Sequence, residues 1–343
     1  LMGFIRLTHR RLVPLAPICI FSREAPAFEG TCPVPRNSNV DQRQRKACMY
    51  DCIIIGGGPA GLTAATYLGR FLRATLVVDA GPGRAARIPT THNLLGFPDG
   101  ISGADLLLRM RQHAARYGAE LANGVVERVE RADTGFIAYT GSQAIEARTI
   151  LLAQGVTNHR PRIEQEAHDR GVAQGLIRYC PICDAYEIRG RRVAVLGCSD
   201  HGAAEAIFVR HYSDTVTLLT QDASELSHAD EANLVRYAIR VERAPVSDLS
   251  VNEKDLLAHL ADGRSLQFDT LYVALGTSAH SELARMAGAE LAPSGCIVVD
   301  EHQQTTISGM FAAGDMVEGL DQIAVAAGQA ARAATSIYIR LSG

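Results

Sequence analysis

The feature that most constrains the fold is an apolar run, residues 52–55, that leads directly into a glycine-rich turn. The turn has the spacing G-x-G-x-x-G, with glycines at Gly56, Gly58 and Gly61, and residues 62–73 follow it with a helix-like pattern. An unbroken apolar run is typical of a parallel strand covered on both faces. In such a turn one glycine makes the bend, one lets a pyrophosphate approach the backbone, and one lets helix and strand pack closely. The order therefore predicts a nucleotide site at the start of a helix.

A second apolar strand, residues 75–78, ends in Asp79. An acid at this place accepts hydrogen bonds from ribose hydroxyls in dinucleotide-binding folds. Strand, glycines, helix, second strand and acid in this order predict an α/β fold of the Rossmann type. For Asp79 alone a second explanation stays open, because an Asp at the end of a strand also begins turns.

Length and composition describe an ordinary globular protein. The chain has 343 residues, which is enough for about two domains, and 47% of them are hydrophobic and 21% charged. A formal net charge of −3 gives no reason to expect a nucleic-acid surface. The apolar runs fall short of the roughly 18 residues of a membrane span, so we expect no membrane segment and a cytoplasmic protein.

Residues 1–48 differ from the rest, with mixed Pro, Arg, Ser and Asn and no steady period. We expect this stretch to be poorly ordered, and Met49, just ahead of a strong strand, suggests an extension upstream of a shorter natural chain. Export is a second interpretation, because the basic start and the apolar run 12–21 resemble part of a signal peptide. Pro14 and Pro17 interrupt that run, and another targeting role also stays open.

Near the C-terminus a short strand runs into the pair Gly314 and Asp315. The segment 309–315 resembles the second FAD signature of flavin disulfide reductases, and this resemblance implies that Asp315 binds the flavin ribitol. A helix of small residues follows, and its first residues, Gln322 and Ile323, would face the flavin. Free amides at a helix N-terminus stabilise negative charge on a reduced ring, although such a helix also packs well in a core.

Residues 91–98 resemble the segment of the same family that lies along the flavin, which makes Asn93 a candidate contact. These matches together imply that FAD occupies the first nucleotide site. His92 has no such support, and we interpret it as an ordinary surface or packing histidine.

Among eight cysteines, only Cys180 and Cys183 are spaced as a recognisable pair. A C-x-x-C unit favours the thiolate, which is the species that attacks a disulfide. A zinc site is one alternative, but it needs about four ligands, and the sequence has no second C-x-x-C or H-x₃₋₅-H partner. We therefore predict no metal. A purely structural pair is the other alternative.

With this pair the chain resembles the low-molecular-weight thioredoxin reductases, which carry C-x-x-C-D inside their second domain. The match covers nearly all of residues 50–343, although Ala185 stands where the family often has Gly. The resemblance implies that Cys183 lies nearest the flavin, that Cys180 exchanges with the substrate disulfide, and that Asp184 relays the proton. A carboxyl beside the thiols suits general acid catalysis, while a helix cap or a solvated acid stays open for Asp184. The resemblance also implies a homodimer and a disulfide substrate such as a thioredoxin-like protein.

A second strand-and-turn unit, with Gly197, Ser199 and Gly202, stands where thioredoxin reductases bind NADPH. Ser199 replaces the middle glycine, and a side chain there crowds the approach of a pyrophosphate. The next strand runs into residues 220–222, where the family has a basic cluster for the 2′-phosphate. This segment offers no basic residue, and Asp222 would repel the phosphate. NADPH is therefore disfavoured, and the donor stays open between NADH, a reduced protein such as ferredoxin, and none.

In the case without a donor, the flavin would oxidise dithiols and pass electrons to oxygen, as in the dithiol oxidases that close disulfides in small natural products. Those enzymes generally carry His directly after the second cysteine, where this chain has Asp184, so the sequence favours a reductase. A non-catalytic flavin redox sensor is a further alternative. Cys198 is a candidate third thiol or, more simply, a small buried residue.

The order of the motifs predicts an α/β architecture with two Rossmann-like dinucleotide-binding domains, the second inserted into the first. The FAD-binding domain would span residues 49–156 and 282–343, and the inserted NAD(P)H-type domain with the C-x-x-C would span 157–281. Gly155 and Gly276 end the two crossovers, and the domain rotation known in the family would hinge there. We predict an FAD-dependent disulfide oxidoreductase that passes electrons from a donor through FAD to its C-x-x-C pair and on to a disulfide substrate.

Overall fold

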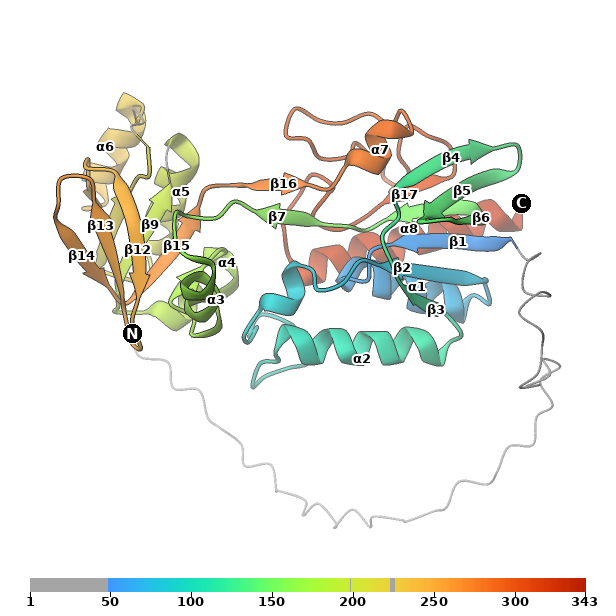
Figure 1. Cartoon of the computed structure of the whole chain (residues 1–343), viewed down its shortest axis with the longest axis horizontal. Coiled ribbons are helices and arrows are strands. Elements are labelled where there is room, and N and C mark those ends of the chain that lie inside the picture. Colours follow the sequence, from blue (N-terminus) through green and yellow to red (C-terminus); the bar gives the residue numbers. More distant parts are fainter. Residues whose placement is uncertain (1–48, 198, 223–225) are drawn as a thin grey trace, which may run out of the picture. The chain divides into compact units, whose positions relative to one another are not determined.

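The computed structural model describes residues 49–197, 199–222 and 226–343 (Figure 1). The predicted extension, residues 1–48, and Cys198 lie outside the described residues. The described part of the chain forms one compact unit. No helix within it is long and apolar enough to cross a membrane.

A large sheet is built around the predicted strand before the glycine turn. β1 (Tyr50–Ile55) pairs in parallel with β2 (Thr75–Asp79) on one side and with β6 (Gln143–Leu152) on the other. β2 pairs in turn with β3 (Glu120–Asn123). The resulting order, β3-β2-β1-β6, puts the carboxyl ends of these strands at one edge of the sheet.

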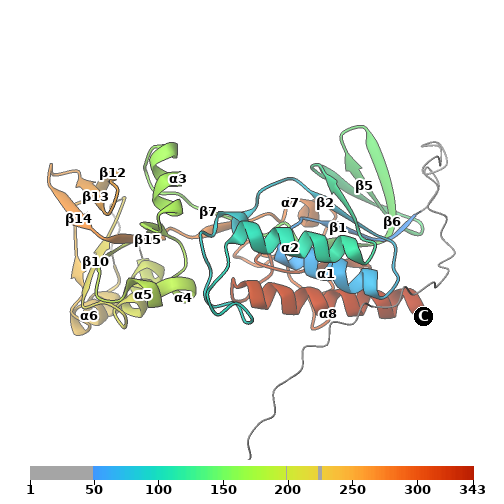
Figure 2. The same ribbon diagram turned by 90° about the horizontal axis from the view of Figure 1, so that it is seen from below.

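Helices cover one face of the large sheet. α1 (Pro59–Arg70) packs against both α2 (Gly103–Arg116) and α8 (Ile323–Ser342), and Figure 2 shows the three helices side by side. Because side chains of a strand alternate between its faces, Cys52 and Ile54 of β1 join the core under these helices. The remaining isoleucines of β1 join a second core on the opposite face.

The opposite face is covered by an antiparallel hairpin and a short helix. β4 (Arg128–Ala132) pairs with β5 (Gly135–Thr140), and β5 pairs with the first half of β6. α7 (Glu282–Met286) packs against β4. β17 (Met310–Ala312) pairs in parallel with the last residues of β6, so the C-terminal Gly-Asp segment comes to the same edge as the glycine turn.

Two short antiparallel strands form the crossovers to the middle of the chain. β7 (Val156–Asn158) pairs with β16 (Thr277–Ala279), as Figure 1 shows. The glycines before them, Gly155 and Gly276, have φ angles of +67° and +86°, which only glycine adopts readily. The predicted domain boundaries fall at or beside this ribbon. Since the described residues form one compact unit, the division into separate domains stays a prediction.

The inserted segment contains a second parallel sheet of five strands, with the order β11-β10-β9-β15-β8. These strands are β8 (Ile177–Arg178), β9 (Arg192–Gly197), β10 (Thr215–Leu219), β11 (Arg240–Val241) and β15 (Thr270–Ala274).

The two faces of this second sheet are covered differently. Residues of α5 and α6 fill the core on one face, and α3 with a three-stranded antiparallel sheet covers the other. The covering elements are α3 (Gln165–Ala173), α5 (Ser199–Val209), α6 (His228–Arg236), β12 (Val246–Val251), β13 (Leu256–Leu260) and β14 (Ser265–Phe268). A parallel sheet needs both faces covered, and this arrangement supplies that cover.

Candidate active site

The two predicted redox cysteines form a disulfide at the start of a short helix. Cys180 is the N-cap of α4 (Pro181–Asp184), Cys183 lies within it, and their Cα atoms are 5.3 Å apart. The N–H of Cys183 donates to the carbonyl of Cys180 at 2.9 Å, which closes the turn. Both residues are half-buried. The disulfide therefore closes a small ring, and its two cysteines are exposed enough for a reaction partner to reach them.

Gln322, from the far end of the chain, reaches both sulfur atoms. Its Nε2 lies 3.4 Å from Cys180 Sγ and 3.2 Å from Cys183 Sγ, and Gln322 is the N-cap of α8. Asn93 Nδ2 donates to Gln322 Oε1 at 2.8 Å. The disulfide thus contacts Gln322 directly and Asn93 only through Gln322, and the sequence predicts both residues along the flavin. Ile323 follows as the first residue of α8.

Asp184 follows the disulfide and has a partner on each carboxylate oxygen. Tyr272 of β15 donates its hydroxyl to Oδ1 at 2.8 Å, and Arg178 of β8 donates from Nη1 to Oδ2 at 2.5 Å. Burial raises the pKa of the Asp184 carboxyl, although the charge of Arg178 and the hydrogen bond from Tyr272 act in the opposite direction. A carboxyl with a raised pKa suits a proton donor.

The alternative roles for Asp184 receive no support. Its side chain makes no cap hydrogen bond to the following 3₁₀ helix, η3 (Ala185–Ile188), and it is only 26% exposed. Glu187 of η3 pairs with His92, with Nδ1 and Oε1 3.3 Å apart. His92, interpreted from the sequence as a surface or packing histidine, is 45% exposed and contacts the segment that carries the disulfide.

The glycine turn between β1 and α1 fits a bound pyrophosphate. A Cβ on Gly61 would lie 1.9 Å from the carbonyl oxygen of Gly56, so helix and strand meet as closely as the pattern predicts. A Cβ on Gly58 would meet nothing within 4 Å, so the backbone there faces open space. No side chain caps the first turn of α1, which leaves its amides free for a phosphate.

Asp79 lies at the end of β2 with its side chain turned to the glycine turn. Its Oδ1 accepts the N–H of Gly57 at 3.1 Å, and its Oδ2 pairs with Arg111 of α2. A contact at 3.4 Å from the N–H of Gly81 also fits the turn-starting role that the sequence left open. This contact is compatible with the predicted role of Asp79 as a ribose acceptor, because the carboxylate lies beside the glycine turn.

Asp315 follows Gly314 after β17, at the edge where β1 and β6 also end. Arg84 of η2 (Arg84–Arg87) lies between two acids, with Nη1 3.2 Å from Asp315 Oδ2 and 2.7 Å from Asp321 Oδ2. Burial and the charge of Asp321 raise the pKa of the Asp315 carboxyl, although Arg84 opposes this. The donor set of Asp315, Arg84 and the glycine turn fits the ribitol and phosphates of FAD.

The second strand-and-turn unit keeps the close packing of a nucleotide turn. A Cβ on Gly197 would lie 2.9 Å from the carbonyl oxygen of Ala274, and one on Gly202 would lie 2.9 Å from the carbonyl carbon of Gly197. Ser199 is the first residue of α5. Its side chain lies outside what the structure describes, so its crowding of a phosphate stays a prediction.

Folding brings one basic residue to the place where the sequence offers none. Arg162 Nη2 lies 2.6 Å from Asp222 Oδ1, and Nη1 donates to the carbonyl of Gln221 at 3.0 Å. Residues 220–222 themselves contain no basic residue. Arg162 lies about 60 residues earlier in the chain, so a local motif does not predict its contact with Asp222.

Three further residues contact the candidate site acids but were not identified from the sequence: Arg84, Arg178 and Tyr272. Arg178 and Tyr272 belong to no motif, and only the pairing of their strands brings them to Asp184. The sequence contained one indication of the contact with Arg84. Asp315 and Asp321 are close in the sequence, and two neighbouring acids favour a positive charge between them.

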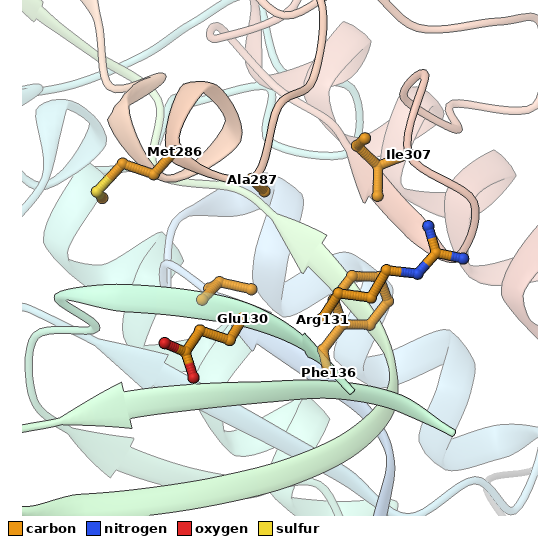
Figure 3. A pocket seen from close by; sticks show the side chains of 7 residues that line it. Glu130, Arg131, Phe136, Met286, Ala287 and Ile307 are labelled. Atoms are coloured by element: carbon orange, nitrogen blue, oxygen red, sulfur yellow. The ribbon is translucent and has the colours of Figure 1, made fainter. Parts of the chain in front are cut away.

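Neither a metal-binding group nor a large cavity marks a different centre in the described part of the chain. No group of three or more His, Cys, Asp or Glu side chains that could hold a metal ion occurs within residues 49–197, 199–222 and 226–343. One cavity of about 390 Å³ lies between the β4–β5 hairpin and α7 (Figure 3). None of the predicted site residues lines it; its walls come from Val129, Glu130, Arg131, Phe136, Met286, Ala287 and Ile307.

Comparison with known proteins agrees with this geometry. The family model for pyridine nucleotide-disulphide oxidoreductases matches residues 50–330. Thioredoxin reductase from Aquifex aeolicus (strain VF5) is 30% identical over 330 residues, which cover 89% of this chain and 97% of that protein. Thioredoxin reductase from Treponema pallidum (strain Nichols) is 31% identical over 281 residues, which cover 78% of this chain and 89% of that protein.

The fold is shared as well. The crystal structure of thioredoxin reductase from Streptococcus pyogenes MGAS5005 superposes with a TM-score of 0.79 at 25% identity, covering 86% of this chain and 98% of that chain. The predicted α/β class with two Rossmann-like units is therefore confirmed. The chain belongs to the pyridine nucleotide-disulphide oxidoreductase family and is a disulfide-reducing flavoenzyme of the low-molecular-weight thioredoxin reductase type.

Proposed function

We propose that this enzyme takes electrons from a donor, passes them to the Cys180–Cys183 disulfide, and reduces an external disulfide. The observation that carries the proposal is the position of this disulfide against Gln322, the N-cap of α8. The same amide side chain accepts a hydrogen bond from Asn93. Of the two segments predicted to hold a flavin, one therefore contacts the sulfur atoms through Gln322, and the other contacts Gln322 through Asn93.

FAD would be held by residues at the shared edge of the large sheet. The glycine turn and Asp79 suit its pyrophosphate and ribose, and Asp315 with Arg84 suits its ribitol and phosphates. Gln322 and the free amides at the start of α8 would lie along the ring. When bound, FAD supplies two electrons to the disulfide. The residues proposed for FAD are Gly56, Gly58, Gly61, Asp79, Asn93, Gly314, Asp315, Gln322 and Ile323.

The exchange step proceeds through the reduced cysteines. The Cys180 thiolate attacks one sulfur of an external disulfide, and the second substrate sulfur leaves with the electron pair of the broken bond and takes a proton from Asp184. The Cys183 thiolate then attacks Cys180 Sγ, which re-forms the internal disulfide and releases the first substrate sulfur as a thiolate. Two electrons have passed from the cysteine pair to the substrate.

The substrate and the assembly follow from the family. A thioredoxin-like protein is the proposed partner, since the relatives are named for this reaction, and a small-molecule disulfide is the second candidate. A homodimer and a cytoplasmic location belong to the same proposal. Equilibrium sedimentation tests the homodimer, and a monomer at micromolar concentration would contradict it.

The cysteine roles can be tested with single serine variants. Cys180→Ser and Cys183→Ser should both abolish turnover of a disulfide substrate, because each removes one of the two sulfur atoms that carry the electrons. Cys296→Ser is the matched control, since Cys296 is a free, half-buried thiol and should leave turnover unchanged. A Cys180→Ser/Cys183→Ser variant that retains full turnover, or a protein that cannot be reconstituted with flavin, would refute the proposal.

The donor can be identified by anaerobic titration of the flavin. NADH, NADPH, reduced ferredoxin and a dithiol are added in turn while the flavin absorbance is followed. We expect NADH to bleach the flavin at lower concentration than NADPH, because Asp222 would repel a 2′-phosphate bound beside residues 220–222. Bleaching by the dithiol alone, followed by recovery in air, would support the oxidase alternative instead.

A further inference from the structure

Tyr272 is a buried polar residue that the exchange chemistry above does not use. It lies in β15, has no exposed surface, and packs among the apolar side chains of the core on the α5 face. Ala185 and Ile188 of η3 belong to the same core. A hydroxyl in such surroundings requires a partner, and the one it has is Asp184 Oδ1 at 2.8 Å.

Arg178 approaches the same carboxyl from the neighbouring strand. β8 and β15 run parallel, and their register pairs Arg178 directly with Tyr272. Paired residues of adjacent strands project to the same face of a sheet. The sheet therefore directs both side chains toward α4, and Arg178 is itself fixed by a second hydrogen bond, from its Nε to the carbonyl of Gly175 at 2.9 Å.

The two donors occupy different oxygens of the carboxyl. Tyr272 bonds Oδ1, and Arg178 bonds Oδ2. Because each oxygen has a fixed partner, the carboxyl cannot rotate about its last bond without breaking a hydrogen bond. A proton carried by Asp184 must then occupy a lone pair that neither donor uses.

We propose that Tyr272 and Arg178 are positioning residues that hold the carboxyl of Asp184 in one orientation for proton transfer to the sulfur that leaves. The inference rests on the proposed function of the Cys180–Cys183 pair. Within the described part of the chain, no hydrogen bond joins either residue to the reacting sulfur atoms, so both act through Asp184.

The charged groups around Asp184 decide the direction of the effect. Arg178 favours the carboxylate, whereas Glu187 of η3 and burial favour the protonated acid. His92 pairs with Glu187 and not with Asp184. The thiolates that form on Cys180 and Cys183 add further negative charge beside α4. Loss of either donor therefore raises the pKa of the Asp184 carboxyl further.

The test is the pH dependence of disulfide turnover in the flavin-loaded enzyme. Turnover requires protonated Asp184 and falls as the pH rises through its pKa. In Tyr272→Phe this falling limb should move to higher pH by about one unit, since one hydrogen bond to a charged group is lost. Tyr186→Phe is the matched control because Tyr186 is 62% exposed in the same segment, and its limb should stay in place.

A second readout does not depend on turnover. Iodoacetamide alkylates the thiolate of reduced Cys180, and peptide mass spectrometry measures the rate at each pH. The pH profile therefore reports how readily Cys180 ionises beside the Asp184 carboxyl. Tyr272→Phe should shift this profile in wild-type background and leave it unchanged in an Asp184→Asn background. Equal shifts in both backgrounds would mean a merely structural role and would overturn the inference.

Arg178 provides the variant that guards against a folding failure of Tyr272→Phe. Arg178→Met should move the falling limb to higher pH. Arg178→Lys should bring the limb part of the way back toward its wild-type position, because lysine keeps the charge but lacks the planar donor. No shift in any of these variants refutes the positioning role while leaving the cysteine chemistry intact. Full turnover of Cys180→Ser refutes the proposed function itself, so the two failures are distinguishable.

Discussion

Cys52 and Cys296 differ in burial, and burial decides how a thiol reacts. Cys52 lies inside β1 with no exposed surface, which raises the pKa of its thiol to about 12. Cys296 is half-buried. Alkylating reagents attack an accessible thiolate. We therefore expect iodoacetamide at mildly alkaline pH to modify Cys296 in the folded, oxidised enzyme and to leave Cys52 unmodified.

Peptide mass mapping measures both sites in one digest. The unfolded protein is the control, because Cys52 should then react as fast as Cys296. Modification of Cys52 before unfolding would mean that β1 opens in the native state, which its position in the centre of the large sheet argues against.

The junction of β1 and α1 distinguishes two glycines of one motif. A Cβ on Gly61 would overlap the backbone of Gly56, whereas one on Gly58 would meet open space. Gly61→Ala should lower the free energy of unfolding by about 1–3 kcal/mol, the usual cost of overpacking. Gly58→Ala should change it by less than about 1 kcal/mol, because the φ of −80° suits any residue.

The two variants should differ in a second property, their affinity for FAD, and not only in their free energy of unfolding. Gly58→Ala fills the space into which the pyrophosphate would fit, so we expect FAD to bind at least about tenfold more weakly although the apoprotein is stable. Urea unfolding and quenching of FAD fluorescence provide the two measurements. Unaltered FAD binding by Gly58→Ala would show that the dinucleotide does not use this turn.

An ion pair between a buried acid and a half-exposed arginine joins two elements of the inserted segment. Glu242 follows β11 and is 6% exposed, and Arg264 from the β13–β14 turn donates to both of its oxygens, at 2.8 and 3.0 Å. These hydrogen bonds from Arg264 lower the pKa of the Glu242 carboxyl, although burial opposes them. A lowered pKa means that the pair stabilises the fold above the ordinary pKa of Glu and loses this effect as pH falls through the folded value.

Glu242→Gln should therefore lower the free energy of unfolding by about 1–2 kcal/mol at neutral pH and by nearly nothing at a pH low enough to protonate the carboxyl in both the folded and the unfolded state. Urea unfolding across this pH range measures the difference. Glu231→Gln is the control, because its partner Arg243 forms a more exposed pair, and its effect should be smaller. A difference that is constant with pH would show that packing and not charge is responsible.

The sequence predicts elements whose signals are local, and misses contacts that depend on strand pairing. The glycine turn, the cysteine pair and the Gly314–Asp315 segment each lie within a few residues and were recognisable. Tyr272 and Arg178 are 94 residues apart and meet only because β15 and β8 pair in a fixed register. No periodicity in a single sequence encodes that register.

At the scale of the whole molecule, the chain repeats one nucleotide-binding plan in two sheets and modifies the second copy. In the first copy, Asp79 at the end of β2 pairs with Arg111. FAD, the dinucleotide proposed there, has no 2′-phosphate, so the acid repels no group of the ligand at this position. In the second, the strand-end acid Asp222 is held by Arg162, which comes from just after the first crossover. Both copies share the strand-and-turn plan. The arginine that pairs with each acid, Arg111 or Arg162, comes from a different part of the fold, so the motif does not predict it.

The pairing of Asp222 with Arg162 predicts how the donor preference can be changed. While Asp222 is present, its charge opposes a 2′-phosphate and occupies the guanidinium of Arg162. In Asp222→Ala, Arg162 is free to bind that phosphate through charge-assisted hydrogen bonds, so the affinity for NADPH relative to NADH should rise about tenfold or more. Tryptophan is absent from the chain, so isothermal titration calorimetry is the suitable measurement of both dissociation constants.

The double variant Arg162→Ala/Asp222→Ala isolates the guanidinium. It should lose the gain in NADPH affinity, because the phosphate then meets neither the repelling acid nor the attracting base. Asp214→Ala is the matched control, since Asp214 is an acid with 94% exposure that pairs with Arg210 in the turn before β10, at the opposite end of that strand from Asp222. If the double variant keeps the gain in NADPH affinity, then removing the charge of Asp222 is sufficient for the gain and Arg162 does not bind the phosphate. If the wild-type protein already prefers NADPH, then Asp222 does not lie near the 2′-phosphate and the second site binds its donor in another register.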